Sequence, residues 1–206
     1  MSQVNFIENA SAADIADWLE ARLSAALQAN AGCVAITVPG GSTPFPIFAE
    51  LAGRDLDFSR IDVWPGDDRV VPEDHEASNT GKIRSILEPV GAKVTALTPD
   101  ARPPHFAISW LGMGGDGHIA SLFPNTDPDP ADAQKIRCLT PDPLPPEAPF
   151  DRITLTIPAL LDSDEVMFVI RGEEKRAVIE AALAGEHDLP IARFLAASSQ
   201  PVTCFT

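Results

Sequence analysis

The sequence contains few cysteines and no long apolar run, and both features limit the kinds of protein it encodes. Its three cysteines, Cys33, Cys138 and Cys204, are widely spaced and form no Cys-x-x-Cys pair for a metal or a redox centre. Such usage is typical of a reducing compartment. No apolar run approaches the roughly 18 residues that a membrane helix needs, and the first residues lack the basic and apolar order of a secretory signal. We therefore expect a cytoplasmic protein.

Lysine and arginine are also scarce, with 15 of them against 30 aspartates and glutamates, which gives a net charge of −15. A surface of this charge repels nucleic acid and anionic lipid, so we expect neither as a partner. An anionic small substrate would need a local cluster of cations. The length of 206 residues favours one domain over residues 1–206, and this small size favours a monomer.

Apolar runs and helical periodicities alternate along the chain. The spacing of Ser11 and Asp14 predicts a capping box that opens a helix ending near Asn30. Strands are predicted at 33–38, 61–64, 94–97, 106–111, 152–157, 165–170 and 202–205, and further helices at 44–51, 79–87 and 173–183. This alternation predicts an α/β fold, with a doubly wound, mostly parallel sheet and helices on both faces. Twelve of the 20 prolines lie between Pro99 and Pro158, where we expect a long ordered loop.

Ligands bind outside the carboxyl ends of the strands in such sheets, so the segments that follow strands carry the most information. The first of them is Gly40, Gly41, Ser42, Thr43 and Pro44. Glycines let backbone N–H groups approach a ligand, hydroxyls add donors, and the helix start that follows favours an anion. An ordinary turn with a serine or threonine cap and proline in the first helical position explains the same residues.

A glycine turn follows the strand at 106–111. It contains the spacing Gly-x-Gly-x-x-Gly over residues 112–117, which is typical of dinucleotide-binding proteins. However, the chain then enters proline-rich sequence instead of a strand that ends in a ribose-binding acid, and this argues against a dinucleotide site. The turn is better interpreted as presenting Asp116 and His118 at the sheet edge. Imidazole exchanges protons near neutral pH, which suits acid–base catalysis. We interpret the other three histidines as structural or surface residues.

Three further groups are candidates for a polar site, although each is also typical of a solvated turn. Asp67, Asp68 and Arg69 form a polar loop after a strand, Arg152 begins a strand, and Lys175 follows a strand and a glycine. In so acidic a chain these cations are candidate phosphate ligands. No spacing matches a known metal motif, and no Gly-x-Ser-x-Gly elbow or Cys–His arrangement predicts a covalent nucleophile. Water is then the simplest nucleophile.

In this order the motifs resemble the 6-phosphogluconolactonase family, which has the glucosamine-6-phosphate isomerase-like fold. The matching segments are PGGSTP (39–44), DDRVVPEDHEASN (67–79), LGMGGDGHIASLFP (111–124), RITLTIPALLDSDEVMFVIRGEEK (152–175) and LP (189–190). The resemblance implies hydrolysis of 6-phospho-D-glucono-1,5-lactone to 6-phosphogluconate in the oxidative pentose phosphate pathway, with no cofactor and no essential metal.

The resemblance also implies roles for single residues. His118 is the implied general base, with Asp116 in the same turn and Arg69 close by as further catalytic residues. The implied substrate-binding residues are Gly40, Gly41, Ser42, Thr43, Asp67, Arg152 and Lys175. The family usually has glutamate where this chain has Asp68, proline at Gly115 and threonine at Ile119.

Two alternatives remain open for the sequence. One is amino-sugar phosphate isomerisation with deamination; relatives with that activity resemble this chain but carry a glutamate where Phe123 stands. The other is a sugar-phosphate sensor that binds without catalysis. Because the chain is acidic and begins close to the first predicted helix, we expect an enzyme rather than a sensor joined to a DNA-binding segment.

Overall fold

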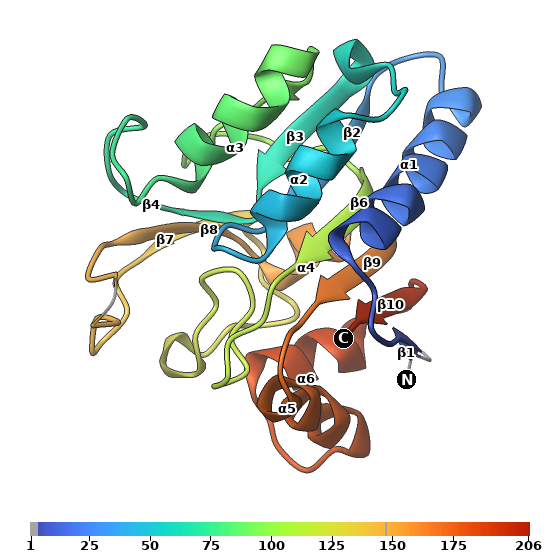
Figure 1. Ribbon diagram of the computed structural model, residues 1–206. Helices are drawn as coiled ribbons and strands as arrows, with labels where there is room; N and C mark the ends of the chain where they lie inside the picture. The colour runs from blue at the N-terminus through green and yellow to red at the C-terminus, as the bar shows by residue number, and fades with distance from the viewer. Residues whose placement is uncertain (1–3, 147) are drawn as a thin grey trace.

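The computed structural model describes residues 4–146 and 148–206, and its centre is a seven-stranded sheet in which all paired strands are parallel (Figure 1). The strand order is β1-β10-β9-β6-β2-β3-β5. The strands are β1 (Val4–Ile7), β2 (Val34–Val38), β3 (Ile61–Pro65), β5 (Lys93–Val94), β6 (Phe106–Leu111), β9 (Ser163–Val169) and β10 (Val202–Phe205). The predicted parallel sheet is confirmed.

Helices cover both faces of this sheet, as predicted. The α-helices are α1 (Ala12–Ala29), α2 (Pro44–Ala52), α3 (Asn79–Leu87), α4 (Ile157–Leu160), α5 (Glu173–Ala184) and α6 (Pro190–Ala197). Neighbouring residues of one strand pack into different apolar clusters: Ile36 of β2 packs with α1, α2 and α3, whereas Ala35 belongs to the cluster that contains α5 and α6. Such strands are apolar throughout because both of their faces are buried.

A second, antiparallel sheet of three short strands lies beside the first. Its order is β4 (Asp67–Arg69), β8 (Arg152–Leu155) and β7 (Ile136–Leu139). Two expectations need correction here. Residues 67–69 form a strand and not a loop, and the proline-rich connection contains β7. Strand β4 lacks the apolar alternation that marks a strand in a sequence, and it pairs with β8, which lies far away in the chain; β7 is a short run of four residues within proline-rich sequence.

Other elements also differ from the expectation. The strand β1 and the helix α6 were not predicted, and β5 begins at Lys93 and ends at Val94 instead of extending to Leu97. Three 3₁₀ turns complete the described elements: η1 (Phe58–Arg60), η2 (Glu88–Val90) and η3 (Pro124–Thr126). Within the described ranges, no helix has both the length and the apolar character to cross a bilayer.

The predicted capping box is present at the start of α1. The Asp14 backbone N–H donates to Ser11 Oγ at 3.2 Å, and the Ser11 backbone N–H donates to Asp14 Oδ2 at 2.8 Å. The helix then buries an apolar stripe that includes Ile15, Leu19 and Leu23. Local sequence therefore sets where this helix begins, and the stripe docks it on the sheet.

We expect Ser11→Ala to lower the free energy of unfolding by about 1 kcal/mol, because the substitution removes the acceptor of the capping box. Urea unfolding followed by circular dichroism measures the change. Ser24→Ala, the same substitution inside α1, is the control and should leave stability unchanged or raise it by about 0.5 kcal/mol, since alanine favours helix interiors. Equal losses in both variants would contradict the assigned cap.

Candidate functional site

A cavity of about 400 Å³ lies where the carboxyl ends of β2, β6 and β9 meet the second sheet. Its lining consists of Pro39, Gly40, Gly41, Ser42, Thr43, Pro44, Asp67, Arg69, Asn79, Trp110, Gly112, Met113, Gly114, His118, Ala120, Val169 and Lys175. Segments that are far apart in the sequence therefore share one cavity. Parallel sheets bind ligands at this edge.

Most residues predicted for the site line this cavity. The lining includes the loop residues 40–43 together with Asp67, Arg69, His118 and Lys175. Asp116 and Arg152 lie outside the lining: Asp116 contacts His118, and the Arg152 guanidinium lies 6.0 Å from the ring centroid of Phe123.

His118 is held by a carboxylate. Its Nδ1 lies 2.6 Å from Asp116 Oδ1, and its backbone N–H donates to the same oxygen at 3.2 Å. The hydrogen bond to His118 is the main cause of a lowered pKa for Asp116, so this carboxylate is ionised at neutral pH. An ionised carboxylate only accepts hydrogen bonds, so Nδ1 carries the proton. The lone pair of a neutral His118 is then on Nε2, where a base needs it.

The glycine turn makes this pairing sterically feasible. A Cβ atom at Gly114 would lie 2.2 Å from His118 Nδ1, so no larger residue fits without moving the imidazole. Gly117 has a φ of +77° and packs so closely on Leu189 that a Cβ would lie 2.9 Å from it. These glycines therefore serve the close approach of a side chain and of α6, instead of the approach of a dinucleotide.

Asp67 is a buried carboxylate in the cavity wall. Its Oδ2 accepts a hydrogen bond of 2.5 Å from Ser121 Oγ, and only 9% of the residue is exposed. Ala120, at a φ of +48°, is the turn residue that precedes Ser121. Burial raises the pKa of Asp67, while the Ser121 hydrogen bond and the charge of Arg69 oppose that rise.

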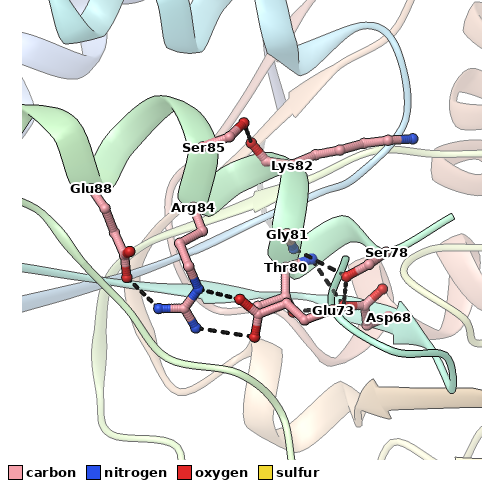
Figure 2. A network of polar contacts seen from close by, with 9 residues as sticks. All are labelled: Asp68, Glu73, Ser78, Thr80, Gly81, Lys82, Arg84, Ser85 and Glu88. Atoms are coloured by element: carbon pink, nitrogen blue, oxygen red, sulfur yellow. Dashed lines mark hydrogen bonds and ion pairs between the residues drawn. The ribbon is translucent and has the colours of Figure 1, made fainter. Parts of the chain in front are cut away.

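The neighbouring Asp68 binds the start of α3, and Figure 2 shows its contacts with Ser78 and Thr80. Its carboxylate accepts hydrogen bonds from the backbone N–H of Asn79 at 2.6 Å and of Thr80 at 2.9 Å, and from the Thr80 hydroxyl at 2.6 Å. It also accepts from the Ser78 hydroxyl at 3.3 Å. Side chains of a strand alternate in direction, and Asp68, outside the cavity lining, anchors the start of α3 to β4.

Asn79, which the sequence predicts only as the start of a helix, also lines the cavity. Its side-chain amide donates to the Asp67 carbonyl at 3.0 Å, and a Cβ at Gly40 would lie 2.1 Å from Asn79 Cγ. Gly40 is therefore required for close packing of the loop on Asn79. The only available signal was a polar residue at a predicted helix start, directly after an acidic block.

Two cations in the lining have polar atoms without a partner among the described residues. Lys175 Nζ makes no hydrogen bond or ion pair with any residue that the structure describes. Arg69 donates from Nη1 to the Ala77 carbonyl at 2.8 Å, but its buried Nε has no acceptor among the described residues. In a chain of net charge −15, these groups are suited to an incoming anion.

Arg152 is 3% exposed and lies behind the cavity wall. It donates from Nη1 to the Phe150 carbonyl at 2.6 Å and from Nη2 to the Ala148 carbonyl at 2.7 Å. In the antiparallel pairing of β4 with β8, Arg152 lies directly opposite Arg69. Burial and the charge of Arg69 lower the pKa of Arg152. Like charges on paired strands repel each other, so an anion near both would relieve this repulsion.

The described residues contain no group of three histidine, cysteine, aspartate or glutamate side chains with the proximity of a metal site. The His118–Asp116 pair therefore lacks the further ligands that a protein-bound zinc ion would need.

Comparisons with known proteins agree with this fold. The family model of glucosamine-6-phosphate isomerases/6-phosphogluconolactonase matches residues 8–96 and 88–203. A 6-phosphogluconolactonase of Neisseria meningitidis is 34% identical over 96% of this chain and 94% of its own length. A crystal structure of a 6-phosphogluconolactonase from Shewanella baltica covers 100% of this chain and 97% of that one, with a TM-score of 0.82 and 27% identity.

We expect Asp67→Asn to change how stability depends on pH. Burial raises the pKa of Asp67 in the folded state. The favourable contribution of this carboxyl group to the free energy of unfolding is therefore complete below its pKa in the unfolded chain, and it is lost as pH rises through its pKa in the folded protein. Asparagine does not ionise and keeps an acceptor for Ser121. The free energy of unfolding of the variant, relative to the wild type, should therefore increase between acid and neutral pH in urea titrations.

The matched control is Asp74→Asn, which removes one negative charge from an exposed position. If Asp67→Asn and Asp74→Asn gave the same pH dependence, the assigned burial effect would be wrong.

Proposed function

Because this chain belongs to the glucosamine-6-phosphate isomerases/6-phosphogluconolactonase family, we propose that it hydrolyses 6-phospho-D-glucono-1,5-lactone to 6-phosphogluconate, a step of the oxidative pentose phosphate pathway. One observation carries the proposal: a carboxylate-paired imidazole lines the same cavity as a lysine whose ammonium group has no partner among the described residues. A lactone phosphate needs both of these groups, a base near its carbonyl and a cation near its phosphate.

The phosphate binds between Lys175 and the loop that holds Ser42 and Thr43. Neither hydroxyl is engaged with another described residue, and both stand at the start of α2, where backbone N–H groups favour an anion. Arg69 and Arg152 add positive charge from the second sheet. Arg152 acts at longer range, since its guanidinium donors point to the carbonyl groups of Ala148 and Phe150.

Anchoring of the phosphate brings the lactone carbonyl to His118. Nε2 removes a proton from a water molecule as the water oxygen attacks the carbonyl carbon, while the Asp116 carboxylate stabilises the resulting imidazolium. Arg69 and backbone N–H groups of the glycine turn stabilise the oxyanion. The bond from the carbonyl carbon to the ring oxygen then breaks, and the imidazolium returns its proton to that oxygen. The open-chain acid leaves, and no group of the protein has changed.

The small size of the chain, 206 residues, supports a monomer as the working unit and residues 1–206 as one domain. The small number of cysteines supports a cytoplasmic location.

The proposal is tested by measuring three properties of the purified chain together. These are hydrolysis of 6-phosphogluconolactone, corrected for spontaneous opening, ammonia release from glucosamine 6-phosphate, and binding of phosphosugars without turnover. We expect enzymatic hydrolysis of the lactone and no ammonia, because Phe123 stands where the deaminating relatives carry a glutamate. Ammonia release or binding alone would overturn the proposal.

We expect His118→Asn to lower kcat for lactone hydrolysis by about 10²- to 10⁴-fold, the range that a general base contributes, with little change in KM. Steady-state kinetics corrected for spontaneous hydrolysis give both constants. His105→Asn is the control, because His105 also pairs with a carboxylate, Asp162, at 2.9 Å but lies outside the cavity. Near-normal kcat in a folded His118→Asn protein would remove the assigned base.

We expect Lys175→Met to lower kcat/KM for the phosphorylated lactone by about 10- to 100-fold, the value of a hydrogen bond to a charged group. Hydrolysis of unphosphorylated gluconolactone should change little, because that substrate has no phosphate to bind. The exposed Lys82→Met on α3 serves as the control for loss of one positive charge. A proportional loss with both substrates would show that Lys175 does not recognise the phosphate.

A further inference from the structure

We propose that Phe123 is a positioning residue, whose ring fixes the orientation of the His118 imidazole during proton transfer. This inference rests on the proposed function, since it takes His118 as the base. The ring centroids of Phe123 and His118 are 4.7 Å apart, with 40° between their planes. Phe123 lies outside the cavity lining, and its ring contacts the base.

The contact supplies a restraint that the Asp116 hydrogen bond does not. That hydrogen bond holds Nδ1 at one edge of the imidazole, but it allows the ring to rotate about the line that joins Nδ1 to Asp116 Oδ1. The side chain of His118 is 32% exposed, so the surrounding residues confine it only in part. An aromatic ring packed beside the imidazole limits this rotation and fixes the direction of the Nε2 lone pair.

Phe123 is itself held firmly. Its backbone N–H donates to Thr126 Oγ1 at 3.1 Å, and the Thr126 hydroxyl donates back to the Phe123 carbonyl at 2.8 Å. On the side chain, the guanidinium of the buried Arg152 lies 6.0 Å from the ring centroid. Two carbonyl groups fix that guanidinium in turn. Arg152, Phe123 and His118 therefore form a continuous series of contacts from the second sheet to the base.

A role in the apolar core does not explain this placement. Phe123 is half-buried and belongs to neither of the two apolar clusters. Its neighbour Leu122, by contrast, is 4% exposed and part of the core. The ring of Phe123 is directed instead to the imidazole and the guanidinium, which is the arrangement that orienting the base requires.

The test compares Phe123→Leu with Phe123→Tyr by kinetics and by NMR of the imidazole. Leucine keeps apolar volume but loses the flat ring, so kcat should fall by about 10- to 100-fold while KM stays within about twofold. The Nδ1–H proton of His118, assigned by its loss in His118→Asn, should exchange faster with water in Phe123→Leu. Phe123→Tyr keeps the ring and should restore both the signal and kcat.

Phe6→Leu is the matched control, because the half-buried Phe6 ring also contacts a guanidinium, that of Arg176 at 5.4 Å from the ring centroid, and neither residue lines the cavity. It should leave kcat and the His118 signal unchanged. An unchanged kcat in Phe123→Leu, or a lower kcat with an unchanged His118 signal, would overturn the role of Phe123 and leave the lactonase proposal standing. A wild-type protein without lactonase activity would refute the lactonase proposal, while the NMR comparison would still decide whether Phe123 orients His118.

Discussion

The hydrogen bond between the Asp116 carboxylate and His118 Nδ1 is the contact on which the proposed chemistry depends. It selects the tautomer that leaves Nε2 unprotonated, and it provides the negative charge that stabilises an imidazolium. The bond requires that the turn carry no side chain at Gly114, because a Cβ there would occupy the space of the imidazole. One local steric condition therefore links the glycine spacing of the sequence to the base of the proposed reaction.

The remaining groups reach this base because two sheets meet at the cavity. The parallel sheet brings the loop after β2 and the start of α5 to one edge, which places Ser42 and Lys175 there. The small antiparallel sheet adds Asp67 and Arg69 from β4. Since the chain carries a net charge of −15, the cations gathered at this edge supply the local positive charge that the proposed phosphate site needs on a protein that otherwise repels anions.

The sequence allowed the parallel sheet and the helices on both faces to be predicted, because β2 and the second half of β9 (Val166–Val169) are buried, mostly apolar runs and α1 carries its own cap. Strand β4 was not predictable, since Asp67, Asp68 and Arg69 show no apolar pattern and pair only with the distant β8. Because side chains alternate in direction along that strand, its two adjacent carboxylates are separated. Asp67 lines the cavity, and Asp68 accepts hydrogen bonds from the start of α3. The position of Arg152 behind Phe123 likewise depends on tertiary packing that no local pattern encodes.

A crystal structure of the protein with 6-phosphogluconate, the product of the proposed reaction, would test the proposed site most directly. We predict that the product carboxylate lies within hydrogen-bonding distance of His118 Nε2, with the phosphate at Lys175 and the hydroxyls of Ser42 and Thr43. A phosphate bound elsewhere, or a carboxylate that faces away from the imidazole, would contradict this prediction.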